Sequence, residues 1–274
     1  MELYKYSGAG NDFVVLDGRK GNDVSEYRRT GTIVSLCDRK TGFRAADGRI
    51  GADGLMILAD ASDCDFEMEY YNSDGSSGMM CGNGGRCIAA FADFLGIRPK
   101  SGDTLVFNAA DGLHTARILS REGDRRIVRL KMIDVREFYP ALDGYFLNTG
   151  TRHFVRFVED VEPLDVETEG RKARFDPAFA PVGANANFVS LSQGGFLSVR
   201  TFEKGVEAET LACGTGITAS AIASYIRGIE PSERCGAMVK YNIHARQDDL
   251  SVEFLPGADC FTDVYLTGPA DLVR

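Results

Sequence analysis

Cys81–Gly96 reads CGNGGRCIAAFADFLG, and Cys213–Gly228 reads CGTGITASAIASYIRG. Each segment opens with Cys-Gly-x-Gly, continues as an apolar run rich in Ala and Ile, and ends at a glycine fifteen residues after its cysteine. A glycine that directly follows an apolar helical run is a typical helix C-cap. We therefore predict helices over Gly85–Leu95 and Gly216–Arg227, each starting close to a cysteine.

A second pair of similar segments lies upstream of these two. Gly8–Leu16 (GAGNDFVVL) precedes the first Cys-Gly-x-Gly segment, Gly183–Leu191 (GANANFVSL) precedes the second, and they share five of nine positions. Two pairs in matching order favour an internal duplication over chance similarity in a glycine-rich chain. The polar stretch Arg121–Arg126 is the predicted boundary, which gives one half of residues 1–125 and a second that begins at residue 126.

The composition excludes several classes of protein. In a chain of 274 residues, 44% hydrophobic and 26% charged residues exclude disordered and fibrous proteins. The net charge of -9 provides no basic footprint, so nucleic acid is not an expected partner. No window resembles a signal peptide or a membrane span, and seven irregularly spaced cysteines indicate no disulfide framework. We expect a cytoplasmic protein with reduced thiols.

Strand-like runs dominate the rest of the chain and indicate an α+β fold. A further helix is predicted over Val24–Arg39. The predicted strands are Asp12–Asp17, Gly54–Ala59, Asp65–Tyr71, Thr104–Asn108, Leu113–Leu119, Ile127–Met132, His153–Val158, Asn187–Leu191, Phe196–Phe202 and Leu250–Leu255.

The two duplicated cysteines are the candidates for chemistry. A thiol where a glycine turn opens a helix lies at the positive end of the helix dipole, which favours the thiolate. Two thiols on either side of one ligand would suit removal of a proton from one face of a carbon acid and its return to the other. The alternative is that each cysteine is a small buried hydrophobe. We assign that structural role to Cys37, Cys64, Cys87, Cys235 and Cys260, which have no repeat partner.

Other motifs are weaker evidence for a function. Gly214-Thr215-Gly216 with Ala219 fits the dinucleotide pattern G-x-G-x-x-A, but no buried parallel strand is predicted before it. The histidines and cysteines show no metal-ligand spacing, so no metal is expected. By default His153 would be a half-exposed strand residue.

Several segments, taken together, resemble those of diaminopimelate epimerases: SGAGNDFVVLD, GADGLMIL, YYNSDGSSGMMCGNGGRC, ETLACGTG and VYLTGPA, in this order over nearly the whole chain. The resemblance implies two pseudo-symmetric domains, 1–125 and 126–263, with 264–274 returning to the first. Each would be a curled, mostly antiparallel sheet around a central helix. It also implies a cofactor-independent interconversion of LL- and meso-diaminopimelate, a step toward lysine and peptidoglycan, and it is compatible with a homodimer.

Carried over residue by residue, Cys81 and Cys213 match the two catalytic cysteines, one acting as thiolate base while the other is the protonated acid. The other matching positions bind substrate or lie near the reacting centre. They are Asn11, Asn72 and Asn185 for the amino and carboxylate groups, Gly82, Asn83, Gly214 and Thr215 as backbone anion sites, and Glu203, Lys204 and His153 as nearby polar residues.

The chain departs from the family pattern at two places. The family usually has Asn-Pro before the matching histidine, where this chain has Thr151-Arg152, and Glu-Arg-Gly where it has Glu203-Lys204-Gly205. A lysine cannot clamp a carboxylate with two parallel hydrogen bonds as an arginine can, so recognition of the distal end of the substrate should change. A related racemase for another amino acid, and a binding protein without turnover, therefore stay as alternatives.

Overall fold

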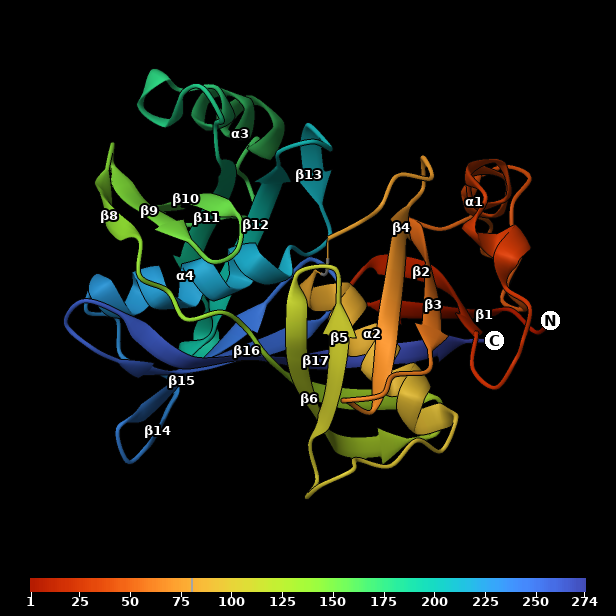
Figure 1. The fold of residues 1–274 in the computed structure, drawn as a ribbon. Coiled ribbons are helices and arrows are strands. Elements are labelled where there is room, and N and C mark those ends of the chain that lie inside the picture. The colour runs from red at the N-terminus through yellow and green to blue at the C-terminus, as the bar shows by residue number, and fades with distance from the viewer. Residues whose placement is uncertain (80) are drawn as a thin grey trace. The chain divides into compact units, whose positions relative to one another are not determined.

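The computed structural model describes residues 1–79 and 81–274. The chain forms two compact units, Met1–Leu130 with Gly268–Arg274, and Lys131–Thr267 (Figure 1). The elements of the first part of the chain are β1 (Tyr4–Gly8), β2 (Asn11–Asp17), η1 (Ser25–Arg28), α1 (Thr30–Cys37), β3 (Gly54–Ala59), β4 (Phe66–Asn72), α2 (Gly82–Phe94), β5 (Leu105–Ala109), β6 (Gly112–Glu122) and β7 (Arg125–Lys131).

The remaining elements belong mainly to the second unit. They are β8 (Phe138–Ala141), β9 (Gly144–Asn148), β10 (Arg152–Phe157), α3 (Val166–Arg174), η2 (Pro177–Phe179), β11 (Asn185–Leu191), η3 (Gln193–Gly195), β12 (Leu197–Glu203), β13 (Ala208–Thr210), α4 (Gly214–Ile226), β14 (Glu233–Cys235), β15 (Met238–His244), β16 (Asp249–Pro256) and β17 (Phe261–Val273). Strand β17 crosses from the second unit to the first between Thr267 and Gly268.

The sheet of the first unit closes on itself around α2. Each strand from β1 to β7 pairs with the next one, β7 pairs with the C-terminal part of β17, and β17 pairs with β1. The β2–β3 and β4–β5 pairs are parallel and the others are antiparallel. Helix α2 is buried from Gly82 to Asp93, so it forms the centre of the core.

The second unit repeats this order of pairing. Its parallel pairs are β10–β11 and β12–β15, and its antiparallel pairs include β9–β10, β11–β12, β15–β16 and β16–β17. Helix α4 follows β12, as α2 follows β4, and most of its residues are buried. The α+β class and the curled sheet around a central helix are therefore confirmed.

The second pair of similar segments was paired wrongly. Because β2 is followed by its parallel neighbour and β11 is preceded by its own, β2 corresponds to β10 and β11 corresponds to β3. Gly183–Leu191 thus matches the segment that leads into β3, not Gly8–Leu16. Both strands are buried along nearly their whole length, so both are apolar runs that look alike in sequence.

The predicted boundary also needs correction. Arg121–Arg126 spans the end of β6, the turn at Gly123 (φ 60°) and the start of β7, and the division falls after Leu130. The stretch is polar because a hairpin tip faces solvent. The predicted helix Val24–Arg39 is likewise interrupted, since Arg29 has an extended backbone (φ -80°, ψ 129°) that separates η1 from α1.

The two Cys-Gly-x-Gly helices are confirmed, and both begin directly after their cysteine, earlier than predicted. They end at Phe94 and Ile226, one residue before the predicted ends, and the glycines expected after them, Gly96 and Gly228, have φ angles of 74° and 82°. In the described ranges 1–79 and 81–274, no helix has the length and apolarity needed to span a membrane.

Candidate functional site

Cys81 is the N-cap residue of α2. Its backbone is extended, and its Sγ accepts a hydrogen bond from the backbone N–H of Gly84 at 3.2 Å. Gly84 has no Cβ, and an added one would lie 3.4 Å from that Sγ. The sulfur therefore takes the place of the oxygen of a typical capping residue, in a setting that stabilises negative charge.

Hydrogen bonds between side chains connect the first turn of α2 with the start of β2 and with the residue before β3. Asn83, which is buried, donates from Nδ2 to Asn11 Oδ1 at 2.5 Å. Asn11 in turn donates to Asp53 Oδ2 at 3.0 Å, and the same oxygen accepts the backbone N–H of Asp12. The predicted residues Cys81, Asn83 and Asn11 are thus brought together within the first unit.

Arg86 is a component of this network that sequence reasoning missed. Its side chain is fully buried and donates to Asn83 Oδ1 at 2.9 Å, to the Gly82 carbonyl at 3.1 Å and to the Pro269 carbonyl at 3.3 Å. It donates to the carbonyl of the residue that follows Cys81 and fixes the Asn83 amide. The spacing Cys-x-x-x-x-Arg inside an apolar helix was a usable signal, because arginine is rarely buried without a specific role.

Asn72 lies at the end of β4, in the turn that leads toward Cys81. Its side chain donates to Ser76 Oγ at 3.0 Å, and its backbone N–H donates to the Ser76 carbonyl. This is the local turn role that asparagine commonly has.

Cys213 is the N-cap residue of α4 and is buried, with 9% exposure. Its Sγ lies 3.4 Å from Thr215 Oγ1. The Thr215 carbonyl accepts a hydrogen bond from Thr149 Oγ1 at 2.9 Å, which fixes the backbone of the first turn. This first turn is the counterpart of the one that begins at Cys81.

His153 is fully buried, so the expectation of a half-exposed strand residue is wrong. It lies on β10, and α4 packs on this strand. Its Nε2 lies 2.9 Å from Thr215 Oγ1 and 2.8 Å from Thr151 Oγ1. Burial lowers the pKa of the imidazole to about 3, so the ring is neutral near pH 7. The structure therefore joins His153 to Thr215 and, through it, to Cys213.

The remaining candidate residues of the second unit are Asn185, Glu203 and Lys204. The buried Asn185 amide donates to the Arg152 carbonyl at 3.0 Å and accepts the Lys204 backbone N–H at 2.7 Å. Glu203 ends β12, and its Oε1 accepts from Thr210 Oγ1 at 2.6 Å. The Lys204 side chain is exposed.

The five remaining cysteines differ in their surroundings. Cys37, Cys64 and Cys87 are buried, as their assigned structural role requires, and Cys87 packs under Gly8. Cys260 is partly buried. Cys235 is exposed because it lies on the short, solvent-facing strand β14, so it is not a buried hydrophobe.

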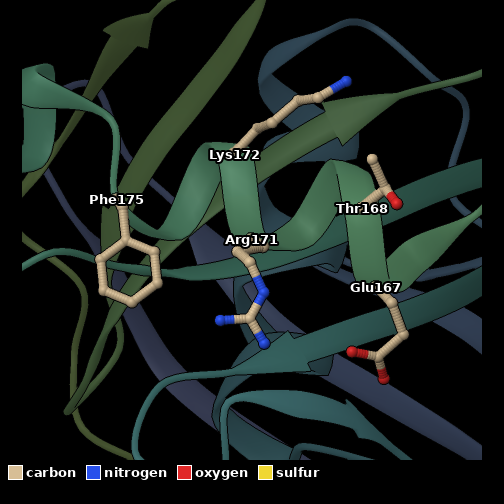
Figure 2. Close-up of a pocket in the computed structure, with 5 residues that line it drawn as sticks. All are labelled: Glu167, Thr168, Arg171, Lys172 and Phe175. Carbon is tan, nitrogen blue, oxygen red and sulfur yellow. The ribbon is translucent and has the colours of Figure 1, made fainter.

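A surface pocket of about 550 Å³ lies on α3 (Figure 2). Its lining belongs to that helix and its C-cap, and consists of Glu167, Thr168, Arg171, Lys172 and Phe175. None of these residues is a candidate of the sequence analysis, and the lining includes no thiol. We assign no chemistry to it.

Comparisons with known proteins bear on both units. The family profile described as diaminopimelate epimerase matches residues 3–127 and 145–273. A diaminopimelate epimerase from Flavobacterium psychrophilum is 42% identical over 273 residues, covering 100% of this chain and 98% of that protein. One from Chlorobaculum tepidum is 40% identical, covering 97% of each chain. The crystal structure of a PhzF-family phenazine biosynthesis protein from Bacillus anthracis has the same fold, with a TM-score of 0.71, 12% identity, and coverage of 100% of this chain and 98% of that one.

Proposed function

This chain belongs to the diaminopimelate epimerase family, and we propose that it interconverts LL- and meso-2,6-diaminopimelate without a cofactor. Membership makes it an epimerase, hence an isomerase. The substrate is proposed from the names of relatives that match over the full length of the chain. The single observation that carries the mechanism is that a cysteine caps the central helix of each of two units with the same order of strand pairing.

We propose that Cys81 and Cys213 act on the same α-carbon. One thiolate removes the α-proton, and the other thiol delivers a proton to the opposite face, so that the configuration inverts and the two thiols exchange protonation states. The helix dipole supports a thiolate at either position. In α2 the Gly84 N–H adds a hydrogen bond to the sulfur. A return turnover starting from meso-diaminopimelate restores the initial state.

The carboxylate of the reacting centre is proposed to bind at the helix N-termini. The N–H groups of the first turn of a helix have no intrahelical partner and attract anions. Gly82 and Asn83 supply such groups in α2, as Gly214 and Thr215 do in α4. Electrostatic stabilisation at this carboxylate would also favour the carbanion that forms when the α-proton leaves.

The polar side chains are proposed to hold the rest of the substrate. Asn11, Asn72 and Asn185 would bind amino and carboxylate groups, although the structure also gives each a bond within the protein. Glu203 would bind an amino group. Lys204, with its backbone fixed by Asn185, would meet the distal carboxylate as a single positive charge.

A second function, racemisation of another amino acid by the same thiols, is favoured by two departures from the family pattern. Lys204 stands where the family usually has arginine, and Thr151-Arg152 where it usually has Asn-Pro. Both changes concern the groups that select the substrate and leave the two cysteines in place.

Incubation with LL-diaminopimelate in deuterated water tests the proposal. We expect the meso form to appear and deuterium to enter at Cα. If fresh, reduced enzyme gives neither, diaminopimelate is not the substrate. Exchange with a different L-amino acid from a panel would then establish the alternative racemase, whereas tight binding of diaminopimelate without exchange would indicate a binding protein.

We further infer that the enzyme works in the cytoplasm, where its thiols stay reduced, and that it needs no nucleic acid or membrane partner. A homodimer is the proposed assembly. Light scattering during size-exclusion chromatography measures it, and a mass of about 29.8 kDa would show a monomer instead.

A further inference from the structure

Three polar groups form a closed triangle beside Cys213. The Nε2 of His153 lies 2.8 Å from Thr151 Oγ1 and 2.9 Å from Thr215 Oγ1, and the two threonine oxygens are 3.0 Å apart. Thr215 Oγ1 is also 3.4 Å from Cys213 Sγ. The Thr151 hydroxyl is therefore linked to the Cys213 sulfur through the Thr215 hydroxyl.

The neighbours of the imidazole determine which of its nitrogens carries the proton. A backbone carbonyl can only accept, so the Asn187 atom 3.0 Å from the Phe154 carbonyl is the amide nitrogen. The same nitrogen lies 3.0 Å from His153 Nδ1, and the amide oxygen accepts from Thr201 Oγ1 at 3.0 Å. Nδ1 of the neutral ring must then accept, and Nε2 must carry the hydrogen.

This assignment limits the directions of the two hydroxyl protons. Because Nε2 donates into the triangle, neither threonine can donate to it. If Thr215 donates to Thr151, the sulfur receives no hydrogen bond from Thr215. If Thr151 donates to Thr215, the Thr215 proton is directed to Cys213 Sγ. A thiolate favours the second arrangement, since hydrogen bonds to an ionised acceptor are roughly twice as strong as neutral ones.

We propose that Thr151 is a positioning residue, whose hydroxyl sets the direction of the Thr215 proton. It accepts that proton while Cys213 is a thiol, and it donates to Thr215 once Cys213 is a thiolate, so that the Thr215 proton is then directed to the sulfur. On the buried side, the Asn187 amide donates to His153, so His153 in turn donates from Nε2. Thr151 contacts Thr215 from the exposed side. It stands at one of the two places where this sequence departs from the pattern of its family.

Three titratable or charged groups on the strands that pack on α4 have other partners. Arg152 on β10 lies over the Phe146 ring, 5.1 Å from its centroid. Glu203 at the end of β12 accepts from Thr210. The Tyr241 hydroxyl on β15 donates to the Ile229 carbonyl, past the other end of α4. The Thr215 hydroxyl, by contrast, lies 3.4 Å from Cys213 Sγ.

Ionisation of Cys213 can be measured without substrate. The full-length, reduced protein is treated with iodoacetamide at a series of pH values, and peptide-resolved mass spectrometry separates Cys213 from the other cysteines. Thr151→Val removes the other acceptor of the Thr215 proton, so it should lower the midpoint pH of Cys213 alkylation by about one unit and leave about tenfold more thiolate below the midpoint. Thr151→Ser keeps the hydroxyl and should restore the wild-type midpoint.

Thr149→Val is the matched control, because the Thr149 hydroxyl bonds the Thr215 carbonyl and not its hydroxyl. Its midpoint should stay near that of wild type. An unchanged midpoint in folded Thr151→Val, or an equal shift in Thr149→Val, would overturn the proposal. The importance of Cys213 for turnover rests on the proposed function. A shifted midpoint in an enzyme that does not exchange the α-proton would therefore refute that function and leave the role of Thr151 standing.

Discussion

Replacing Gly216 with alanine adds one methyl group to the first turn of α4, where the helix meets β10 and β11. An ideal Cβ there would lie 2.3 Å from Asn187 Oδ1 and 3.2 Å from His153 Cε1. Ordinary contacts begin near 3.4 Å, so either the amide or the helix must move by about 1 Å. The Asn187 side chain cannot turn away freely, because it is fully buried and bonded to Phe154, His153 and Thr201.

The cost follows from those bonds. A shift of this size disrupts two or more buried hydrogen bonds, each contributing about 1 kcal/mol net, and adds overpacking of about 1–3 kcal/mol. The helical preference of alanine over glycine offsets at most about 1 kcal/mol. We expect Gly216→Ala to lower the free energy of unfolding by about 2–4 kcal/mol.

Urea denaturation monitored by circular dichroism measures this loss. Gly31→Ala is the matched control: Gly31 lies in α1, and nothing is within 4 Å of its ideal Cβ. The same substitution there should be neutral or stabilise the protein by about 0.5 kcal/mol. Equal unfolding free energies for the two variants would refute the contact between Gly216 and Asn187, and with it the arrangement of the histidine beneath α4.

Three further predictions concern recognition, pH and packing. Lys204→Arg should lower KM for LL-diaminopimelate about threefold to tenfold with little change in kcat, because a guanidinium can hold the distal carboxylate with two hydrogen bonds. An unchanged KM in steady-state assays would show that Lys204 does not bind the substrate. His153 titrates with a pKa of about 3 when folded and near 6.5 when unfolded, so protons favour the unfolded chain. Between pH 7.5 and pH 5 the wild type should therefore lose roughly 2 kcal/mol of stability relative to His153→Gln, and parallel stability curves would contradict a buried neutral histidine. The Asp93 side chain, at the end of α2, is 4% exposed and accepts hydrogen bonds from Arg121 on β6 and Arg126 on β7 at 2.7 and 2.8 Å. Asp93→Ala should cost about 2–3 kcal/mol in urea denaturation, and a loss below about 0.5 kcal/mol would show that this ion pair does not stabilise the first unit.

The sequence predicted the elements whose signal is local. Helices α2 and α4 have a cysteine and glycines at one end, an apolar run, and a positive-φ glycine at the other, so their type and C-terminal ends were readable. Helix α3 was missed because only Val166 and Gly170 are buried in it, and the charges on its exposed face hide the periodicity.

Features set by long-range pairing could not be read from the sequence. His153 is buried because β10 lies beside β11 under α4, and no local pattern reveals that neighbour. For the same reason β2 and β11 were matched as repeats, although their parallel partners lie on opposite sides in chain order. Strand β17 contains Gly268-Pro269, which usually ends a strand, yet it continues by pairing with β7.

Among the candidate residues, too, some have a local sequence signal and others depend on long-range contacts. The two cysteines were found from their position before duplicated helices, whereas Asn187 has no motif of its own. The Asn187–His153 contact arises only when β11 pairs with β10, and the Thr151–Thr215 contact only when α4 packs on β10.

The central claim is that each unit supplies one proton carrier to the same carbon, and single cysteine variants test it most directly. LL-diaminopimelate is incubated in deuterated water with wild type, Cys81→Ala or Cys213→Ala, and conversion to the meso form is followed together with deuterium at Cα. We predict rapid conversion with deuterium incorporation by wild type and no net epimerisation by either variant. Near-normal epimerisation by either variant would contradict the two-thiol account.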